Sequence, residues 1–205
     1  MKKIYHEQWN LFKQAYWKIF FGLFILFLLS SVAVYFFMLK NEALVTTLME
    51  QVSKMFEEKD LIKPDTSAIE LAIGLFKNNT MACLLLFVTG FFPIFLPAIG
   101  IIMMNSAIMG IMFAFMKLSG QAIFPMLFAG IIPHGIFEIP AIIFAGTLAF
   151  YLSIGIFRKI NDARFSFKNC LMNGLKTFLF VCIPLLVIAA AVEAFITPIF
   201  LGMFV

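Results

Sequence analysis

The chain has 205 residues, of which 63% are hydrophobic and 13% are charged, and its mean hydropathy is 1.03. This composition is too apolar to form both the surface and the core of one soluble domain, so it excludes that class. The net charge of +4 matters less than the positions of the charges. We predict an all-α polytopic membrane protein, in which residues 1–205 form a single integral membrane domain and the lipid bilayer is the main partner.

The first expected elements are an interfacial helix and a spanning helix. Residues 1–18 mix lysines with tryptophan and tyrosine just before an apolar run, which is typical of an amphipathic helix in the headgroup region. Residues 19–39 carry no charge and are long enough to cross the bilayer once. No small-residue cleavage site follows this run, so we expect it to remain in the mature chain rather than act as a cleaved signal peptide.

Residues 40–77 are net acidic and are expected to form an amphipathic segment outside the membrane. Apolar residues at helical spacing predict one short helix here, ended by the turn Lys63-Pro64-Asp65. Ser67 and Glu70 have the spacing of a capping box, which predicts the start of a second helix. The apolar residues at helical spacing in the first helix are Leu44, Leu48, Val52 and Met55 or Phe56, and in the second helix Ile69, Ile73 and Phe76 are expected to face inward.

The uncharged stretch from residue 78 to residue 116 is too long for one span and suits two. Pro93 and Pro97 both interrupt helices, so we expect a tight hairpin between spans at residues 78–92 and 98–116. Gly110 belongs to a series of small residues in the second of these spans. Small residues allow neighbouring helices to approach closely, and this face would also permit a homodimer.

The apolar run from residue 122 to residue 157 also exceeds one span. Pro133 suits the first turn of a helix, so we predict a broken helix, with a span at residues 133–157 and a short helical or re-entrant piece at residues 124–132. A basic loop at residues 158–176 precedes the last span, at residues 177–200. The chain is thus expected to cross the membrane about five times.

The charges of the connecting segments predict the orientation. The lysine-rich N-terminus and the basic loop 158–176 should lie in the cytoplasm, and the acidic segment 40–77 should lie outside. We expect a multi-pass cell-membrane protein with a cytoplasmic N-terminus and an external C-terminus. The basic loop suits an orientation signal and lipid contact better than a nucleic-acid site, so no nucleic-acid partner is expected.

Polar side chains in the apolar runs are the candidate functional residues, because such groups are costly in hydrocarbon unless they are satisfied. His134 and Glu138 are four residues apart and share a helix face, which suits a hydrogen bond between them, a proton or ligand site, or a cation site. Two ligands leave the rest of a metal's coordination shell unassigned, so we assign no metal and no cofactor. Residue counting places the following side chains at one level in the outer leaflet: Asn78, Asn79, His134, Glu138 and Glu193.

Other candidates fit structural roles. Asn105 is expected deeper in the membrane, where an amide most often joins helices. The string around His134 also contains Pro133, Gly135 and Pro140, which shape the backbone, and Pro198 follows Glu193. The chain has no Ser-His-Asp order, zinc-protease helix or phosphate-binding loop, so catalytic residues stay unassigned and an enzyme is the less favoured class.

Several of these residues carry a family resemblance. In order and spacing, residues 76–198 resemble the stage II sporulation protein M family of integral membrane proteins. The matching residues are Asn78-Asn79, Asn105 followed by Gly110, the string from Pro133 to Ala141, Gly146, and Glu193 to Pro198. The resemblance implies either a membrane anchor that acts with cell-wall hydrolases in sporulation or a component of circular-bacteriocin maturation beside an ATP-binding transport partner. His134, Gly135 and Glu138 favour the second, wider branch, because sporulation members tend to lack them.

Three hypotheses follow from the sequence. The leading one is a membrane component of a multiprotein machine for peptide export, peptide maturation or envelope remodelling. The second is a small transporter or channel, coupled to protons or cations, in which Glu138 contacts the permeant. The third is an intramembrane peptide-processing enzyme using His134 and Glu138, which lacks an assigned nucleophile or metal.

Overall fold

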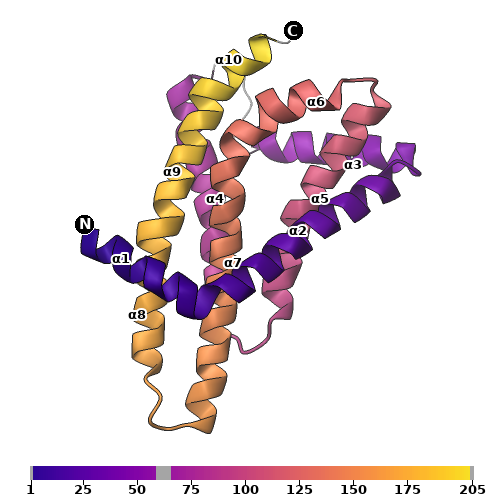
Figure 1. Ribbon diagram of the computed structural model, residues 1–205. Coiled ribbons are helices and arrows are strands. Elements are labelled where there is room, and N and C mark those ends of the chain that lie inside the picture. The colour runs from indigo at the N-terminus through magenta and orange to yellow at the C-terminus, as the bar shows by residue number, and fades with distance from the viewer. Residues whose placement is uncertain (1, 59–65, 204–205) are drawn as a thin grey trace.

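The computed structural model describes residues 2–58 and 66–203, and this part of the chain consists of helices and their connections, without a strand. Five helical stretches are long and apolar enough to cross a membrane. They are Lys2–Met38, Ala68–Thr89, Leu96–Leu118, Ile123–Asn161 and Phe167–Gly202. The predicted all-α bundle with about five spans is confirmed (Figure 1).

The first stretch is one bent helix composed of α1 (Lys2–Leu11), the π-helical turn η1 (Phe12–Tyr16) and α2 (Trp17–Met38). Tyr16 is fully buried at the bend, and its hydroxyl group lies 3.3 Å from Oγ1 of Thr177. Thr177 in turn donates a hydrogen bond to the side-chain oxygen of Gln8. Residues 2–18 are therefore helical and pack against the last helical stretch, and their placement in the headgroup region stays a prediction.

The next two helices are present, but the predicted inward face of the second is partly wrong. The predicted amphipathic helix is α3 (Glu42–Glu58), in which Val45 is buried and Leu44 is 40% exposed. In α4 (Ala68–Thr89) the Ser67–Glu70 capping box forms as predicted, but Ile69 and Ile73 are exposed. An apolar face of a membrane helix can face lipid as well as protein, so helical spacing does not identify the buried side. The side chains of Val52, Met55 and Phe56 and the turn at Lys63-Pro64-Asp65 lie outside the described residues.

The predicted hairpin and its close helix contact are both present. A turn connects α4 to α5 (Leu96–Leu118), with Pro97 in the first turn of α5. A Cβ atom on Gly110 would lie 2.5 Å from the backbone oxygen of Ser31, so α2 and α5 are in direct backbone contact at this point. Ser30 of α2 and Ser106 of α5 hydrogen-bond across the same interface, with their hydroxyl oxygens 2.6 Å apart. The small residues of α5 therefore serve a contact within the chain.

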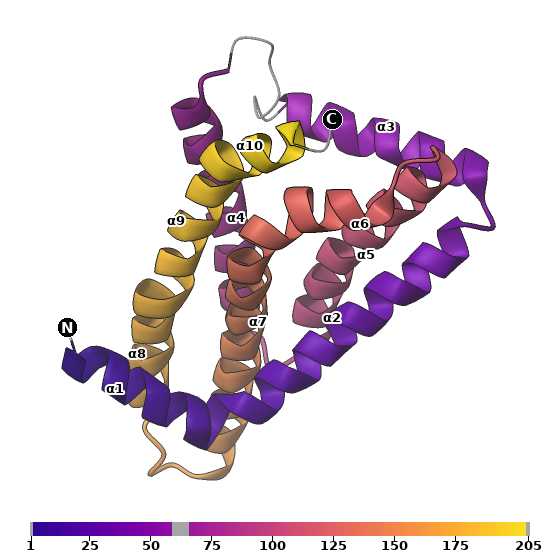
Figure 2. The ribbon, with the colours of Figure 1, turned by 45° about the horizontal axis from the view of Figure 1, so that its top comes forward.

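The predicted break at Pro133 is also present. The short helix α6 (Ile123–Met126) and the π-helical turn η2 (Leu127–Ile131) lie across the end of α7 (Ile132–Asn161), so the chain changes direction there (Figures 1 and 2). Pro133 occupies the first turn of α7, where the missing N–H group costs no helical hydrogen bond. Residues 124–131 are thus helical, in agreement with the prediction of a short helical piece.

The last stretch is a stack of short helical segments without an intervening loop. It contains α8 (Phe167–Thr177), η3 (Phe178–Cys182), α9 (Ile183–Ala191), η4 (Val192–Ile196) and α10 (Thr197–Gly202). Two of these segments are π-helical turns, in which the backbone is locally widened. Glu193 lies in the second of these turns, η4.

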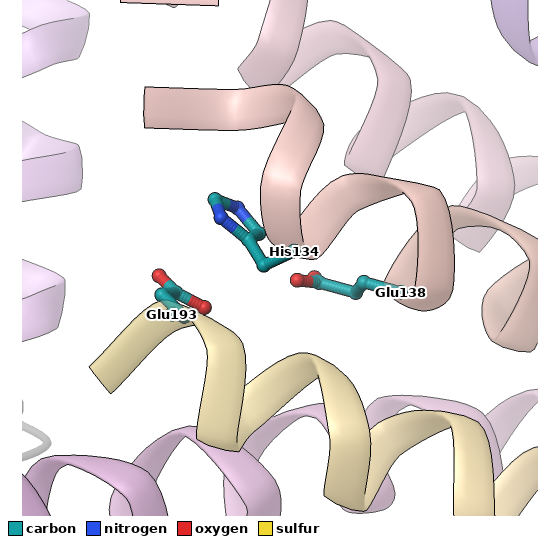
Figure 3. A group of neighbouring side chains, drawn as sticks. All are labelled: His134, Glu138 and Glu193. Atoms are coloured by element: carbon teal, nitrogen blue, oxygen red, sulfur yellow. The ribbon is translucent and has the colours of Figure 1, made fainter. Parts of the chain in front are cut away.

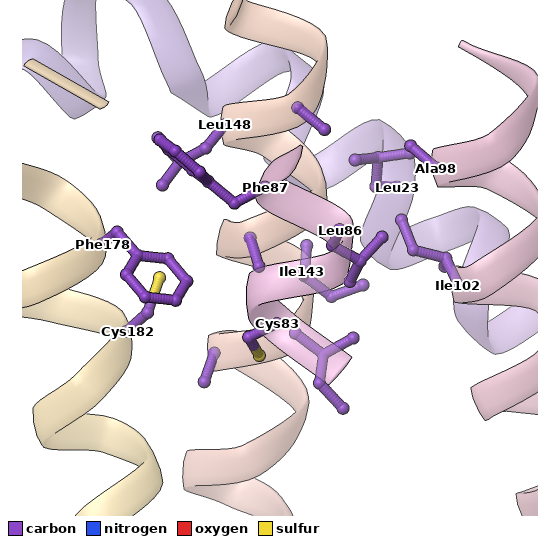
Figure 4. Close-up of a cluster of buried hydrophobic side chains, with 14 of the residues drawn as sticks. Leu23, Cys83, Leu86, Phe87, Ala98, Ile102, Ile143, Leu148, Phe178 and Cys182 are labelled. Carbon is purple, nitrogen blue, oxygen red and sulfur yellow. The ribbon is translucent and has the colours of Figure 1, made fainter. Parts of the chain in front are cut away.

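Helix α7 forms the centre of the bundle and contacts α2, α4, α5, α8 and α9. Its buried face meets α4 and η3 in the main apolar core (Figure 4). A Cβ atom on Gly90 would lie 2.7 Å from Cα of Ala149, so glycine lets the end of α4 approach the α7 backbone. The core side chains labelled in Figure 4 are Leu23, Cys83, Leu86, Phe87, Ala98, Ile102, Ile143, Leu148, Phe178 and Cys182.

The connections of the bundle separate into two ends. The turn after α4 and the loop after α7 lie at one end, and α3, α6 and α10 lie at the other (Figure 1). At the first end, Ser153 links α7 to the turn after α4 by donating hydrogen bonds to the backbone oxygens of Gly90 and Phe92. This arrangement agrees with a topology in which the basic loop and the α4–α5 turn share a side, and which side faces the cytoplasm stays a prediction.

Candidate functional site

Three polar side chains meet where α7 passes η4. His134 and Glu138 come from α7, and Glu193 comes from η4. One potential ligand atom from each residue, an imidazole nitrogen or a carboxylate oxygen, lies within 4.8 Å of the others. Figure 3 shows His134 and Glu138 on one helix facing Glu193 on the other. The sequence predicted a common level for these residues, and the structure brings them into one group, which we call the His-Glu-Glu cluster.

Local backbone features position the cluster. After the break, α7 starts at Ile132, two residues before His134, and His134 and Glu138 stand one turn apart on the same face. Glu193 lies in a π-helical turn, a form that is often found at functional sites. Pro198 occupies the first turn of the following helix, α10, and Pro140 lies inside α7. Prolines and π-turns therefore flank the cluster on both helices.

Helix α4 adds Asn79, one of the two predicted asparagines. The side chain of Asn79 forms a hydrogen bond with the carboxyl group of Glu138. Asn78 is its half-buried neighbour on α4. The cluster is therefore built by three helical stretches that are far apart in the sequence, and Asn79 orients one of its carboxyl groups.

Asn105 does not join this group. Its amide donates a hydrogen bond of 2.9 Å to the backbone oxygen of Ile101, within α5. Asn105 was expected to join two helices. This hydrogen bond lies within one helix and does not do so. A Cβ atom on Gly135 would make only ordinary van der Waals contacts, so no close neighbour requires a glycine at this position.

Unsatisfied polar atoms gather on the elements that build the cluster. Among the described residues, the buried side-chain atoms without a hydrogen-bond partner are Oγ1 of Thr80, Nδ1 of His134 and Oγ1 of Thr197. Thr80 follows Asn79 on α4, and Thr197 stands one turn after Glu193. Buried polar groups normally find a partner in the protein or in bound water or ions. Nδ1 of His134 belongs to the cluster itself, so the cluster contains a buried nitrogen that lacks a partner within the described part of the chain.

The charges of the cluster also indicate a binding site. Glu138 and Glu193 interact electrostatically with each other, and within the described residues no lysine or arginine forms an ion pair with either. Charged groups at membrane depth are costly unless they pair with one another or with a bound ion. The arrangement can therefore hold a proton, a cation or a donor group of a ligand.

Comparison with known proteins places the chain in a family. Residues 23–198 match the model of the family described as "Stage II sporulation protein M". The chain belongs to the stage II sporulation protein M family. It is also similar to an uncharacterized protein of Methanocaldococcus jannaschii, with 24% identity over 84% of this chain and 78% of that protein. No solved structure matches the chain.

This family member also contains an apolar cavity of about 740 Å³ on the other side of α7 from the cluster. Five residues of α7, including Gly135, Ile136 and Ile139, line it, and the rest of its wall comes from α2, α5, α6 and η2. Ligand cavities commonly fall in the range of about 300–1,000 Å³. The sequence gives no signal for this cavity, because its lining residues resemble any other lipid-facing or core residues.

Thr80 and Thr197 were also absent from the sequence-based candidates. Threonine is common in membrane helices, where it often bonds to its own backbone, so a lone threonine does not stand out. The available signal was the spacing of Thr197 four residues after Glu193, which places both on one helix face.

Proposed function

We propose that this protein is a membrane subunit of a multiprotein machine that exports or matures a hydrophobic peptide, with the His-Glu-Glu cluster as its working site. The observation that carries the proposal is the cluster itself, which places one histidine and two glutamates at one end of a helical bundle, with no ion pair to a lysine or arginine of the described residues. Almost all of the described residues belong to the helical bundle, so substrate handling would depend on the bundle and on partner proteins.

The family supports a role in an assembly, and the residues of this chain favour one branch of it. His134, Gly135 and Glu138 favour the circular-bacteriocin branch over engulfment during sporulation. The sequence contains no phosphate-binding loop, so an energy-requiring step would need an ATP-binding partner. Cell-wall hydrolases are the alternative partners if the role is envelope remodelling.

The apolar cavity supports a hydrophobic cargo. Its lining is apolar apart from the hydroxyl groups of Ser31 and Tyr35. Ile136 lines the cavity and is also 63% exposed, so the cavity is accessible from the surface of the bundle. An apolar peptide segment in the bilayer could enter without crossing a polar barrier, and α7 would separate it from the cluster by the thickness of one helix.

Depth along α7 supports a site on the outer side. Tyr151 packs edge-on against Tyr16, with ring centroids 5.0 Å apart, and Tyr16 lies between the basic residues Lys13 and Lys18. Glu138 precedes Tyr151 by 13 residues on α7. If these lysines mark the cytoplasmic surface, Glu138 therefore lies roughly 20 Å into the membrane. That position is past the middle of a hydrocarbon core of about 30 Å.

Partner capture tests the assembly. The tagged chain, purified from its native membrane in mild detergent, should bring down the same ATP-binding or hydrolase partner in repeated preparations. A tagged membrane protein of similar size from the same cells is the control. Repeated recovery of the chain without a partner would overturn this part of the proposal.

Site-specific photocrosslinking tests the cargo. A photoreactive residue at Ile136 should crosslink to the peptide precursor, whereas one at Met104 should not. Met104 is a matched control because it is 68% exposed on α5 but does not line the cavity. Equal labelling from both positions would show that the contact with peptide is not specific to the cavity.

The second candidate function is a cation- or proton-coupled transporter, and the uncompensated carboxyl pair is the observation that favours it. Liposomes containing the purified chain would then show a cation or proton flux that Glu138→Gln reduces. A flux that is absent, or unchanged in this variant, would remove the transporter as an alternative.

A further inference from the structure

We propose that His134, Glu138 and Glu193 bind a divalent transition-metal cation, with Zn²⁺ as the best match. The proposal deepens the proposed function, because the metal would occupy the same cluster. It adds a ligand that the sequence could not assign, since His134 and Glu138 alone provide only two donors from one helix face.

The geometry is close to that of a metal site. In a tetrahedral site with metal–ligand distances of about 2.1 Å, the ligand atoms lie roughly 3.4 Å apart. The three ligand atoms here already lie within 4.8 Å of one another, although they come from segments almost 60 positions apart. Rotation about the side-chain bonds of the two glutamates can close the remaining distance, which is about 1.4 Å at most by this estimate. The backbone need not move.

The charges also favour a divalent cation. Glu138 and Glu193 together can supply two negative charges, and no lysine or arginine of the described chain forms an ion pair with them. A bound ion of charge +2 would neutralise both at once, and a bound cation is often the largest charge in such a site. This would remove the cost of holding two neighbouring carboxylates at membrane depth.

The donor atoms select the type of metal. Mg²⁺ and Ca²⁺ prefer oxygen ligands throughout, whereas an imidazole nitrogen with carboxylate oxygens suits Zn²⁺ and its neighbours in the first transition series. Nδ1 of His134 is buried without a hydrogen-bond partner in the described part of the chain, so no contact there occupies that atom of the imidazole. Asn79 holds Glu138, as the outer partners of metal-binding carboxylates commonly do.

The number of ligands suggests how the site would be used. Three protein ligands leave at least one coordination position for water or for a group of the substrate, which is the arrangement found in working rather than purely structural zinc sites. A peptide carbonyl or terminal carboxylate would suit the open position. The metal would thus give the export or maturation machine a point at which it recognises a polar group of its peptide.

The test measures metal binding to the purified full chain without any partner. The protein carries a tag without histidine, is stripped with a chelator and is titrated with Zn²⁺ by calorimetry. Co²⁺ replaces Zn²⁺ for absorption spectra, and X-ray absorption identifies the ligand atoms. We expect one Zn²⁺ per chain, nitrogen and oxygen ligands without sulfur, and at least tenfold weaker binding in His134→Gln, Glu138→Gln and Glu193→Gln.

Two variants serve as matched controls. His6→Ala removes the other histidine of the chain, which is exposed in α1, and Glu42→Gln removes an exposed carboxylate in the first turn of α3. Both should bind Zn²⁺ as the unmodified chain does. Each glutamine variant is nearly isosteric with glutamate, so folding can be confirmed by gel filtration and helical content before titration.

Three results would overturn the proposal. These are the absence of stoichiometric binding of Zn²⁺ or Co²⁺, binding that persists in the Glu138→Gln, Glu193→Gln double variant, and a metal held by cysteine sulfur. The first result would leave protons as the neutralising charge. Since partner capture is measured separately, a chain that binds metal but no partner would refute the proposed function alone, and a chain that binds a partner but no metal would refute the metal site alone.

Discussion

Polar side chains on the two sides of α7 differ in whether they find hydrogen-bond partners. On one side, at the contact between α2 and α5, Ser30 and Ser106 hydrogen-bond to each other and to backbone oxygens of their own helices. On the other side, where α7 meets α4 and η4, Nδ1 of His134 has no partner, and Glu138 and Glu193 approach each other without an ion pair to lysine or arginine, as far as the described residues show. Satisfied polar groups in a membrane stabilise helix contacts, whereas unsatisfied ones indicate a ligand. We therefore infer that the first region maintains the fold and that the second performs the function.

The largest effect should come from overpacking the α2–α5 contact. Gly110→Leu would place side-chain atoms where a Cβ atom alone already comes 2.5 Å from the backbone oxygen of Ser31. Core overpacking commonly costs 1–3 kcal/mol, and we expect a loss of about 3 kcal/mol in the free energy of unfolding because the obstacle is backbone. Unfolding of the purified chain in mixed detergent micelles measures this change.

Gly100→Leu is the matched control, because Gly100 lies in the same helix and a Cβ atom there would have no contact within 4 Å among the described residues. It should leave the free energy of unfolding within about 1 kcal/mol of the unmodified value. Equal destabilisation by both substitutions would show that α5 is sensitive to any added side chain, and the assigned role of the α2–α5 contact would be wrong.

The next effect is the opposite combination, a loss of function without a loss of stability. The double variant Glu138→Gln, Glu193→Gln should reduce the activity of the native system at least tenfold, which corresponds to about 1.4 kcal/mol. In the absence of metal its stability should be equal or higher, because removing two neighbouring buried charges also removes their desolvation cost. Peptide export or maturation, normalised to the amount of inserted protein, measures the first quantity.

The control for this variant is Glu42→Gln, which removes an exposed carboxylate in α3. It should retain activity. If the double variant also retains activity while folded, the cluster contributes to packing alone, and the two sides of α7 differ less than their hydrogen bonding suggests.

The sequence predicted the fold well because membrane thickness fixes the length of a span and proline fixes where a helix can begin. The hairpin before Pro97 and the break before Pro133 followed directly from these constraints. The capping box at Ser67 and Glu70 was equally predictable, since it depends only on neighbouring residues. Features governed by local chemistry could thus be derived without knowledge of the bundle.

Helix rotation could not be derived in the same way. Ile69 and Ile73 were expected to face inward, yet they are exposed, because lipid is as apolar a surrounding as the protein core. The same uncertainty applied to the site. Residue counting placed Glu138 and Glu193 at one level, but their meeting depends on the rotation of both helices, which is set by packing against all their neighbours.

A smaller effect tests the satisfied side. Ser106→Ala removes the hydrogen bond to Ser30 across the α2–α5 contact but leaves a small side chain, so the helices can still approach. Hydrogen bonds between membrane helices contribute about 0.6 kcal/mol on average and rarely more than 1.7. We expect a loss of this size in the free energy of unfolding and normal activity. A loss of activity at unchanged stability would place a functional group in the region that we assign to the fold.

The smallest effect is expected at Asn105, which belongs to the family resemblance but lies apart from the cluster. Its amide bonds to Ile101 of its own helix, a bond that joins no other element. Asn105→Ala should therefore change the free energy of unfolding by less than about 0.5 kcal/mol and leave activity intact, as for a site without a distinctive contact. The same assays used for the glutamate variants give both values. A strong loss of activity in a folded Asn105→Ala chain would contradict the assignment of function to the His-Glu-Glu cluster alone, because it would extend the working surface across α7 to α5.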